Sequence, residues 1–271
     1  GVAAQTEFLI GKGVDCLYPT GTTGEMYLMS AEEREKVAET VVDTAAGRAT
    51  VYIHTGAMRQ DDTIRLARHA AAIGADGVGV VTPSYFTVDR RAMAEYYRAV
   101  CAAVPEDCPV YVYVIPQLAH NDITPEAMDE IAAANPNIVG VKYSHPDMSR
   151  LIEYTQVRGG DFSVVFGADH MFLPALVAGA DGTVSGCSGP LPEPFVEVYR
   201  QYLAGDVAGA EKAQRTATEW CALTRYGADM SIFKTILTDR GVPAGHMRRP
   251  LLDLTADQAA ALLDRARPFY S

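Results

Sequence analysis

Residues 138–144 have the sequence Ile-Val-Gly-Val-Lys-Tyr-Ser, a run of β-branched and aromatic residues that is typical of a buried strand. Runs of the same kind recur at intervals of about 30 residues, with amphipathic stretches between them. This alternation predicts β/α units around a parallel sheet. The seven strands expected are 15–20, 49–55, 77–82, 109–115, 138–144, 162–166 and 182–185.

Helical patterns fill the intervals between these strands. They cover residues 31–46, 61–73, 91–104, 125–135 and 149–158, and a helix-like stretch at 4–12 precedes the first expected strand. Seven strands are one fewer than a closed barrel contains. We therefore expect an α/β fold of the (β/α)8 TIM-barrel type, with the first strand missing from this chain as given.

Only helical patterns follow residue 189, at 194–203, 207–222, 230–240 and 255–270. One of these helices would complete the last β/α unit, and the others are expected to form a C-terminal helical appendage. We expect residues 1–190 to form the barrel units and residues 191–271 to supply the last barrel helix and the extension. No Ser/Gly-rich linker separates the two parts, so they should pack as one domain.

The composition argues against several classes of protein. The chain has 271 residues, 48% of them hydrophobic, and a formal net charge of −11. This acidic balance disfavours nucleic-acid and anionic-membrane partners, because phosphate groups would be repelled. No apolar run is long enough to cross a bilayer, and the five cysteines lack the spacing of a zinc or redox motif. We expect buried, reduced thiols in a cytoplasmic protein that acts on a small molecule.

Lys142 is the only one of the five lysines that lies in an expected strand. It is near the carboxyl end of that strand, where the reactive groups of β/α barrels gather. Alternation along the strand directs its side chain away from the helices and into the barrel. In partly apolar surroundings the neutral amine of such a lysine is a nucleophile for carbonyl carbon. The alternative is a lysine held in an ion pair with a neighbouring carboxylate.

Two further segments place polar groups at the same end of the expected sheet. Residues 21–25, Gly-Thr-Thr-Gly-Glu, follow strand 15–20, and their amides and hydroxyls are suited to a carboxylate. A plain tight turn would have the same composition. Tyr113 lies near the end of strand 109–115, one layer closer to the mouth than Tyr111 on the same face. We expect a substrate to reach Tyr113, the alternative being a packed core tyrosine.

Several motifs, in matching order, resemble one enzyme family. They are Gly-Thr-Thr-Gly-Glu at 21–25, Val-Thr-Pro-Ser-Tyr at 81–85, Tyr-x-x-Pro at 113–116, Val-x-Val-Lys at 139–142, Gly-Ala-Asp at 167–169 and Ala-Asp-Gly-Thr-Val-Ser at 180–185. Together they closely resemble the dihydrodipicolinate synthase and N-acetylneuraminate lyase family of pyruvate-type class I aldolases. The resemblance covers about the first 190 residues, and the helical tail also fits that family.

The resemblance implies a catalytic set. The lysine matching Lys142 forms a Schiff base with a 2-oxo acid, and the resulting cation is the electron sink for making or breaking a C–C bond. The tyrosine matching Tyr113 carries the proton. Its hydroxyl is linked, through the threonine matching Thr22, to a tyrosine matching Tyr85 that typically comes from a neighbouring subunit. The substrate carboxylate would lie against Thr22 and Thr23. A homodimer, paired into a homotetramer as is usual in the family, is therefore implied.

The family pattern also indicates residues around the rest of the substrate. The matching positions are Leu118, Ser144, Gly167, Asp169 and Val184. Dihydrodipicolinate synthases usually have an arginine for aspartate semialdehyde where this chain has Leu118. Leu118 and Ser144 resemble the lyase pattern, which favours an uncharged, hydroxylated aldehyde portion. His170 and Gly186 depart from the lyase pattern and argue against strict sialic acid specificity.

Several functions remain open at this point. The leading interpretation is a Schiff-base aldolase or lyase that uses pyruvate and an aldehyde, with an N-acetylneuraminate-like or 2-keto-3-deoxy sugar acid as the joined molecule. The alternatives are 4-hydroxy-tetrahydrodipicolinate synthase, a 2-keto-3-deoxy sugar acid dehydratase, and a non-catalytic barrel that binds a keto acid. Imine chemistry needs no metal or cofactor, so we expect neither. His54 and His120 lie where they could reach the mouth, although a lone histidine is usually a packing residue.

Overall fold

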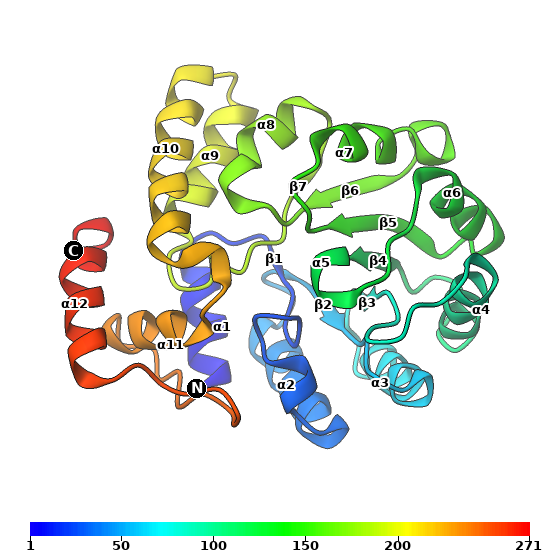
Figure 1. Cartoon of the computed structure of the whole chain (residues 1–271), viewed down its shortest axis with the longest axis horizontal. Coiled ribbons are helices and arrows are strands. Elements are labelled where there is room, and N and C mark those ends of the chain that lie inside the picture. Colours follow the sequence, from blue (N-terminus) through cyan, green and yellow to red (C-terminus); the bar gives the residue numbers. More distant parts are fainter.

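The computed structural model describes all 271 residues and contains one parallel sheet of seven strands. The strands are β1 (Cys16–Leu17), β2 (Thr50–His54), β3 (Gly77–Val81), β4 (Val110–Val114), β5 (Ile138–Tyr143), β6 (Ser163–Phe166) and β7 (Gly182–Thr183). Their order in the sheet is their order in the chain, with β1 and β7 at the edges. The sheet curls as a TIM-barrel-like fold does (Figure 1). All seven strands lie where the sequence pattern predicted them.

The helices that connect the strands cover the outside of the curled sheet (Figure 1). They are α2 (Ala31–Ala45), α3 (Gln60–Ala72), α4 (Arg90–Cys101), α6 (Pro125–Ala134) and α7 (Met148–Tyr154). Helix α1 (Val2–Gly11) precedes β1 and packs against α2. Two short helices, α5 (Pro116–Ala119) and α8 (Phe172–Val177), were not predicted. Each is too short to show a helical repeat of hydrophobic residues in the sequence.

Capping residues define where several of these helices begin. Ser30 and Glu33 form a capping box at the start of α2, in which each side chain bonds the backbone N–H of the other. Thr124 caps α6, and Pro125 occupies the first helical position, where its missing N–H costs nothing. The capping box at Ser30 fixes the start of α2 shortly after the Gly-Thr-Thr-Gly-Glu segment, which follows β1.

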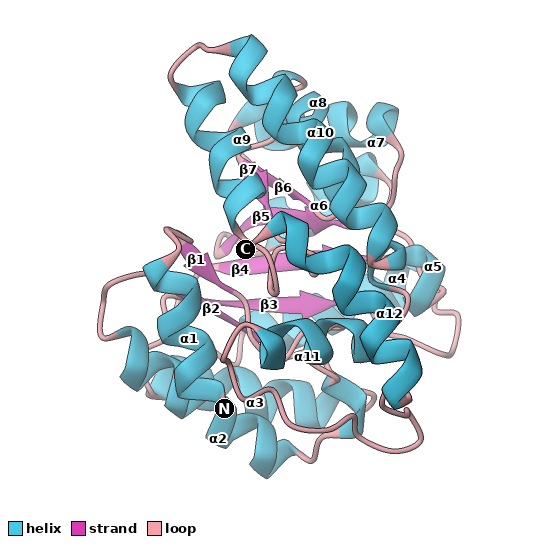
Figure 2. Ribbon diagram, turned by 90° about the vertical axis from the view of Figure 1, so that its left-hand side faces the viewer, coloured by secondary structure: helices cyan, strands magenta, loops and turns pink.

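Two hydrophobic clusters form the core. A cluster of 37 buried residues packs the strands against the helices around them, and a second of 18 residues joins α8 to the helices that follow it. These last helices are α9 (Glu193–Leu203), α10 (Val207–Leu223), α11 (Met230–Asp239) and α12 (Ala256–Ala266). They lie on one side of the molecule, at the left of Figure 1, and Figure 2 views them from that side, in front of the sheet. Helix α11 is joined to α1 through Arg240, whose guanidinium lies 4.8 Å from the Phe8 ring centroid.

All five cysteines are free thiols, but the expectation that all are buried is wrong for one of them. Cys16 is exposed, because successive side chains of a strand point to opposite faces and Leu17 takes the buried face of β1. Among the helices, none combines the length and the apolar composition needed to span a membrane.

Candidate active site

Lys142 lies near the carboxyl end of β5 with only 7% of its surface exposed. Lys12 and Lys234 form ion pairs with glutamates at 2.8 Å, but Lys142 has no carboxylate partner. Its Nζ lies 3.9 Å from the ring centroid of Tyr113 and 4.6 Å from that of Tyr18. The two rings meet edge to face at 86°. The amine is therefore enclosed by aromatic faces, which attract its cation and exclude water.

Strand register and a glycine place these tyrosines beside Lys142. Tyr113 is paired with Lys142 across β4 and β5. The hydroxyl of Tyr18 fills the space where a side chain at Gly79 of β3 would lie, since a Cβ there would overlap it. A glycine inside a strand marks such a close approach, yet the strand pattern alone did not single out Tyr18. The pKa of Tyr18 is raised well above its usual value, mainly because the side chain is buried and secondly because Tyr113 lies nearby. Tyr18 therefore stays a neutral phenol.

The Gly-Thr-Thr-Gly-Glu turn brings Thr22 to Tyr113, and their hydroxyl oxygens lie 3.1 Å apart. Thr20, just before the turn, has a φ of 59°, and its hydroxyl donates to the carbonyl of His54 at 2.8 Å. Glu25, at the other end, has a φ of 62° and is buried in an ion pair with a lysine of α11 at 2.8 Å. Both ends of the turn are thus fixed, which holds Thr22 against Tyr113.

His54 supports this turn from inside the protein, with 1% of its surface exposed. Its Nδ1 lies 2.9 Å from the carbonyl oxygen of Thr20, and its Nε2 has no partner. The guanidinium of Arg34 donates to the carbonyls of His54 and Gly56 at 2.7 and 2.8 Å. The pKa of His54 is lowered well below its usual value, mainly because the side chain is buried and secondly because Arg34 and Lys142 are positively charged. Neither Arg34 nor this network was expected from the sequence.

Ser144, Gly167 and Asp169 come together where β5 and β6 end. Ser144 is buried, and a Cβ at Gly167 would overlap its hydroxyl, so the glycine leaves that hydroxyl room. The Oδ2 atom of Asp169 accepts the Cys187 N–H at 3.2 Å, but its Oδ1 has no hydrogen-bond partner. Burial raises the pKa of Asp169, while nearby hydrogen-bond donors and the charge of Lys142 act in the opposite direction. An unused acceptor is therefore present on this side of the site.

The loop after β7 approaches the Gly-Thr-Thr-Gly-Glu turn. The hydroxyl oxygen of Thr23 lies 2.5 Å from the position that a Cβ at Gly186 would take, so a larger residue at 186 would displace it. Val184, the first residue of this loop, is half-buried, and its N–H donates to the carbonyl of Phe166 at 3.0 Å. The hydroxyl-bearing residue of the lyase pattern would therefore compete with Thr23 for space at position 186, and Gly186 avoids this overlap.

Leu118 and Tyr85 are predicted site residues with large apolar side chains that are exposed. Leu118 lies on α5 and is 55% exposed. Tyr85 is 73% exposed, has a φ of 74°, and packs its ring against Phe86 with the centroids 5.0 Å apart. The hydroxyl of Thr22 bonds to Tyr113 and not to Tyr85. A link between Tyr85 and Thr22 is therefore not made within one chain.

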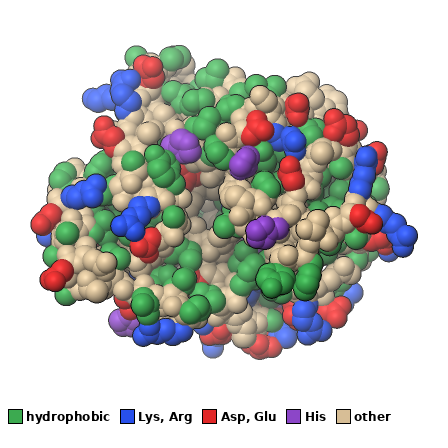
Figure 3. All heavy atoms as spheres, in the orientation of Figure 1, with side chains coloured by type: hydrophobic (Ala, Val, Ile, Leu, Met, Phe, Trp, Pro, Cys, Tyr) green, Lys and Arg blue, Asp and Glu red, His purple; other side chains and the backbone are tan.

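The surface above these groups is hollowed. The arrowheads of β5 and β6 point toward the middle of the molecule in Figure 1, and Figure 3, in the same orientation, shows a hollow there. Histidine and hydrophobic side chains lie around it, together with atoms of the backbone and of other side chains without a charge colour. The fold and this arrangement define a β/α protein that carries a buried amine, hydroxyls and a carboxylate around one opening at the carboxyl end of a parallel sheet.

The chain belongs to the dihydrodipicolinate synthetase family, whose model matches residues 2–266. It is 37% identical to an uncharacterised DapA-like lyase of Halobacterium salinarum, over 96% of this chain and 84% of that protein. It is 30% identical to the N-acetylneuraminate lyase of Mediterraneibacter gnavus, over 99% of this chain and 88% of that protein. Among solved structures it is similar to YagE of E. coli in complex with pyruvate, with a TM-score of 0.91, 30% identity, and coverage of 98% and 91% of the two chains.

These comparisons confirm the resemblance seen in the motifs. Members of this family are carbon–carbon lyases, and the chain is an enzyme of the class I pyruvate aldolase type. The relatives include both N-acetylneuraminate lyases and 4-hydroxy-tetrahydrodipicolinate synthases, so family membership alone leaves the aldehyde partner open.

Proposed function

We propose that this protein is a Schiff-base aldolase that joins or cleaves pyruvate and an uncharged, hydroxylated aldehyde, acting on an N-acetylneuraminate-like or 2-keto-3-deoxy sugar acid. The observation that carries this proposal is the setting of Lys142. A lysine that is 7% exposed, has no carboxylate partner and lies between two tyrosine rings is suited to nucleophilic attack on a carbonyl.

In the proposed reaction, the neutral amine of Lys142 adds to the keto carbon of the 2-oxo acid. The hydroxyl formed in this step takes up a proton from solvent and leaves as water, which gives an iminium ion. During cleavage the hydroxyl proton of the substrate passes to Tyr113, the C–C bond breaks, and its electron pair moves to the iminium nitrogen to form an enamine. An aldehyde leaves. Protonation and hydrolysis of the enamine then release pyruvate and free Lys142. Thr22, 3.1 Å from Tyr113, is placed to pass the proton onward.

The Gly-Thr-Thr-Gly-Glu turn is the proposed site of the pyruvate carboxylate. Thr22 is half-buried and Thr23 is exposed, so that both hydroxyls and the turn amides are available to an anion. The bonds of Thr20 with His54 fix the turn before substrate arrives. Pre-organised donors of this kind bind a carboxylate without the entropy cost of ordering a loop.

The opposite side of the site supports a hydroxylated aldehyde. Ser144 provides a hydroxyl, and the Oδ1 atom of Asp169 is an acceptor without a partner. A carboxylate at this place suits a sugar hydroxyl and repels a second substrate carboxylate. Leu118, which replaces the arginine usual in dihydrodipicolinate synthases, offers no cation for aspartate semialdehyde. A 2-keto-3-deoxy sugar acid dehydratase would share the imine and enamine steps and remains the second candidate.

Trapping with borohydride tests the imine. The protein is incubated with pyruvate and sodium borohydride, and its intact mass is measured before peptide mapping. We expect one pyruvate adduct on Lys142 in the wild type and in the control variant Lys212→Arg, which changes an exposed lysine of α10. Lys142→Arg should give none, because arginine stays protonated. An adduct elsewhere, or none in folded protein, would contradict the proposal.

A substrate screen tests the aldehyde. The protein with pyruvate is offered N-acetylmannosamine, short sugar aldehydes and aspartate semialdehyde, and the products are separated by mass and by retention. We expect C–C bond formation with a hydroxylated aldehyde at a kcat/KM at least roughly tenfold above that for aspartate semialdehyde, the loss that one unpaired charge would cause. The reverse ranking would identify 4-hydroxy-tetrahydrodipicolinate synthase instead.

A further inference from the structure

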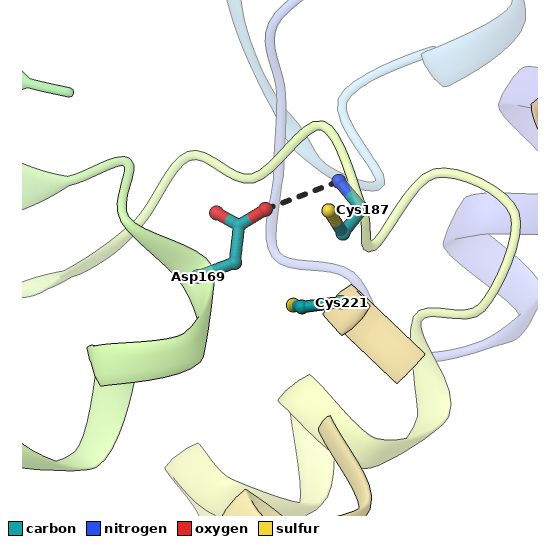
Figure 4. A group of neighbouring side chains, drawn as sticks. All are labelled: Asp169, Cys187 and Cys221. Atoms are coloured by element: carbon teal, nitrogen blue, oxygen red, sulfur yellow. Dashed lines mark hydrogen bonds between the residues drawn. The ribbon is translucent and has the colours of Figure 1, made fainter. Parts of the chain in front are cut away.

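Three buried side chains from distant parts of the sequence point toward one another beside the site (Figure 4). Asp169 lies in a short 3-10 helix (Asp169–Met171) after β6, Cys187 in the loop after β7, and Cys221 in α10. One carboxylate oxygen and the two Sγ atoms all lie within 4.8 Å of one another. This is the only such group of three potential metal ligands in the structure.

The bonds around the group hold its members in place and leave one acceptor of Asp169 unfilled. The Oδ2 atom of Asp169 accepts the Cys187 N–H at 3.2 Å, and the Thr224 hydroxyl lies 3.6 Å from the Cys187 Sγ. Asp169 is 8% exposed, has no ion-pair partner, and leaves Oδ1 without a hydrogen bond. A buried carboxyl group with an unfilled acceptor is one that a bound ion or an ordered water commonly completes.

We propose that Asp169, Cys187 and Cys221 bind one thiophilic divalent cation, for which Zn²⁺ is the best match. Two thiolates and a carboxylate oxygen are ligands that zinc commonly takes, whereas Mg²⁺ and Ca²⁺ prefer oxygen ligands alone. Small rotations of the side chains would bring the three atoms to tetrahedral spacing, and water would complete the coordination. Binding releases the two thiol protons. The remaining Asp169 oxygen stays available to a substrate hydroxyl.

The role of this ion is structural and separate from the proposed imine chemistry. It would join the loop after the edge strand β7 to α10 and to the end of β6. That loop also contains Gly186, whose small size leaves room for Thr23. The ion would therefore hold one wall of the site in place. The expectation of no metal rested on the imine reaction and on the lack of a zinc-like spacing among the cysteines. That spacing gave no sign of this group, because its members meet only in the folded chain.

Metal binding by the full chain tests the proposal. Protein purified without chelators is reduced with a phosphine, stripped, and titrated with Zn²⁺ against a chromophoric chelator, and with Co²⁺ by absorption spectroscopy. We expect about one ion per chain and a thiolate-to-Co²⁺ charge-transfer band, as two cysteine ligands require. Cys187→Ser and Cys221→Ser should each weaken Zn²⁺ binding by roughly tenfold or more, the least that loss of a ligand should cost. Cys101→Ser, which changes a buried thiol in the other core cluster, should bind as the wild type does.

Two results would overturn the proposal. One is reduced wild-type protein that binds no Zn²⁺ or gives a Co²⁺ spectrum without a thiolate band, and this measurement needs no variant to fold. The other is Zn²⁺ affinity of Cys221→Ser equal to that of Cys101→Ser. Neither result bears on borohydride trapping at Lys142, so failure of the metal site and failure of the aldolase function are distinguishable.

Discussion

The Nζ atom of Lys142 lies 3.9 Å from the centroid of the Tyr113 ring, and the two residues face each other across neighbouring strands. The contact therefore follows from the register of β4 and β5 and does not depend on a flexible loop. The face of the Tyr113 ring borders the amine, and the hydroxyl of the same side chain is bonded to Thr22. One tyrosine thus borders the proposed nucleophile and supplies the proposed proton carrier.

Tyr113→Phe separates these two roles. The ring contact with Lys142 is kept, so we expect the pyruvate adduct to form with borohydride as in the wild type. Turnover should fall by ~10²–10⁴, because proton transfer by a positioned side chain is lost. Steady-state kinetics and intact mass measure the two effects. Loss of trapping together with turnover would show instead that the hydroxyl is needed for imine formation itself.

Thr22→Val tests the hydrogen bond that links Thr22 to Tyr113. Valine keeps the shape but removes the hydroxyl, which leaves the buried Tyr113 oxygen without its partner. We expect kcat to fall roughly 5- to 150-fold, about 1–3 kcal/mol in the activation barrier, because the hydroxyl that passes the proton onward from Tyr113 is lost. Thr22→Ser should restore most of the activity. Equal losses in Thr22→Ser and Thr22→Val would assign the effect to packing.

Gly79→Ala tests whether the position of Tyr18 depends on the glycine opposite it. An alanine Cβ would overlap the Tyr18 hydroxyl and displace the ring from Lys142. We expect a loss of about 1–3 kcal/mol in the free energy of unfolding, as for other overpacked cores, together with reduced borohydride trapping. Gly182→Ala is the matched control on β7, because no atom lies within 4 Å of its new Cβ. Similar urea midpoints for the two variants would contradict this account.

The seven strands, most helices and the meeting of Lys142 with Tyr113 were predictable, because each depends on a local period or on the carboxyl ends of parallel strands being neighbours. Tyr18, Arg34 and the group around Cys187 were not. The place of Tyr18 depends on space left by a glycine on another strand, and Arg34 acts through backbone carbonyls, which leave no pattern in the side chains. Cys187 and Cys221 meet only through the packing of α10.

Acid should destabilise the protein through His54. The folded pKa of His54 is lowered well below the value of about 6.5 expected in the unfolded chain, so the unfolded state binds the proton more readily. The stabilising contribution is therefore complete above pH ~6.5 and is lost as the pH falls below it. His54→Asn keeps a donor for the Thr20 carbonyl but cannot take up a proton in this pH range. It should therefore remove the pH-dependent contribution of His54 to the free energy of unfolding. The unfolding free energies of wild type and variant should approach each other by up to about 1.4 kcal/mol per pH unit below pH 6.5. Parallel curves from pH 7 to pH 5 would contradict this explanation.

Tyr85 offers a test of whether the site is completed by a second subunit. It is 73% exposed and makes no hydrogen bond to Thr22 of its own chain. The family resemblance implies that it reaches Thr22 of a neighbouring subunit. Tyr85→Phe and Lys142→Arg should each be nearly inactive alone. If Tyr85 acts across a two-fold interface, a mixed dimer of the two variants contains one site with both Lys142 and Tyr85 intact. Co-expression followed by subunit exchange should then recover about a quarter of wild-type activity, since half of randomly mixed dimers are hybrids and each has one working site.

If Tyr85 acted within its own chain, every site of the hybrid would lack one of the two residues and activity would stay at the level of the single variants. Sedimentation at assay concentration provides the control, because the mixture must be at least dimeric for recovery to be interpreted.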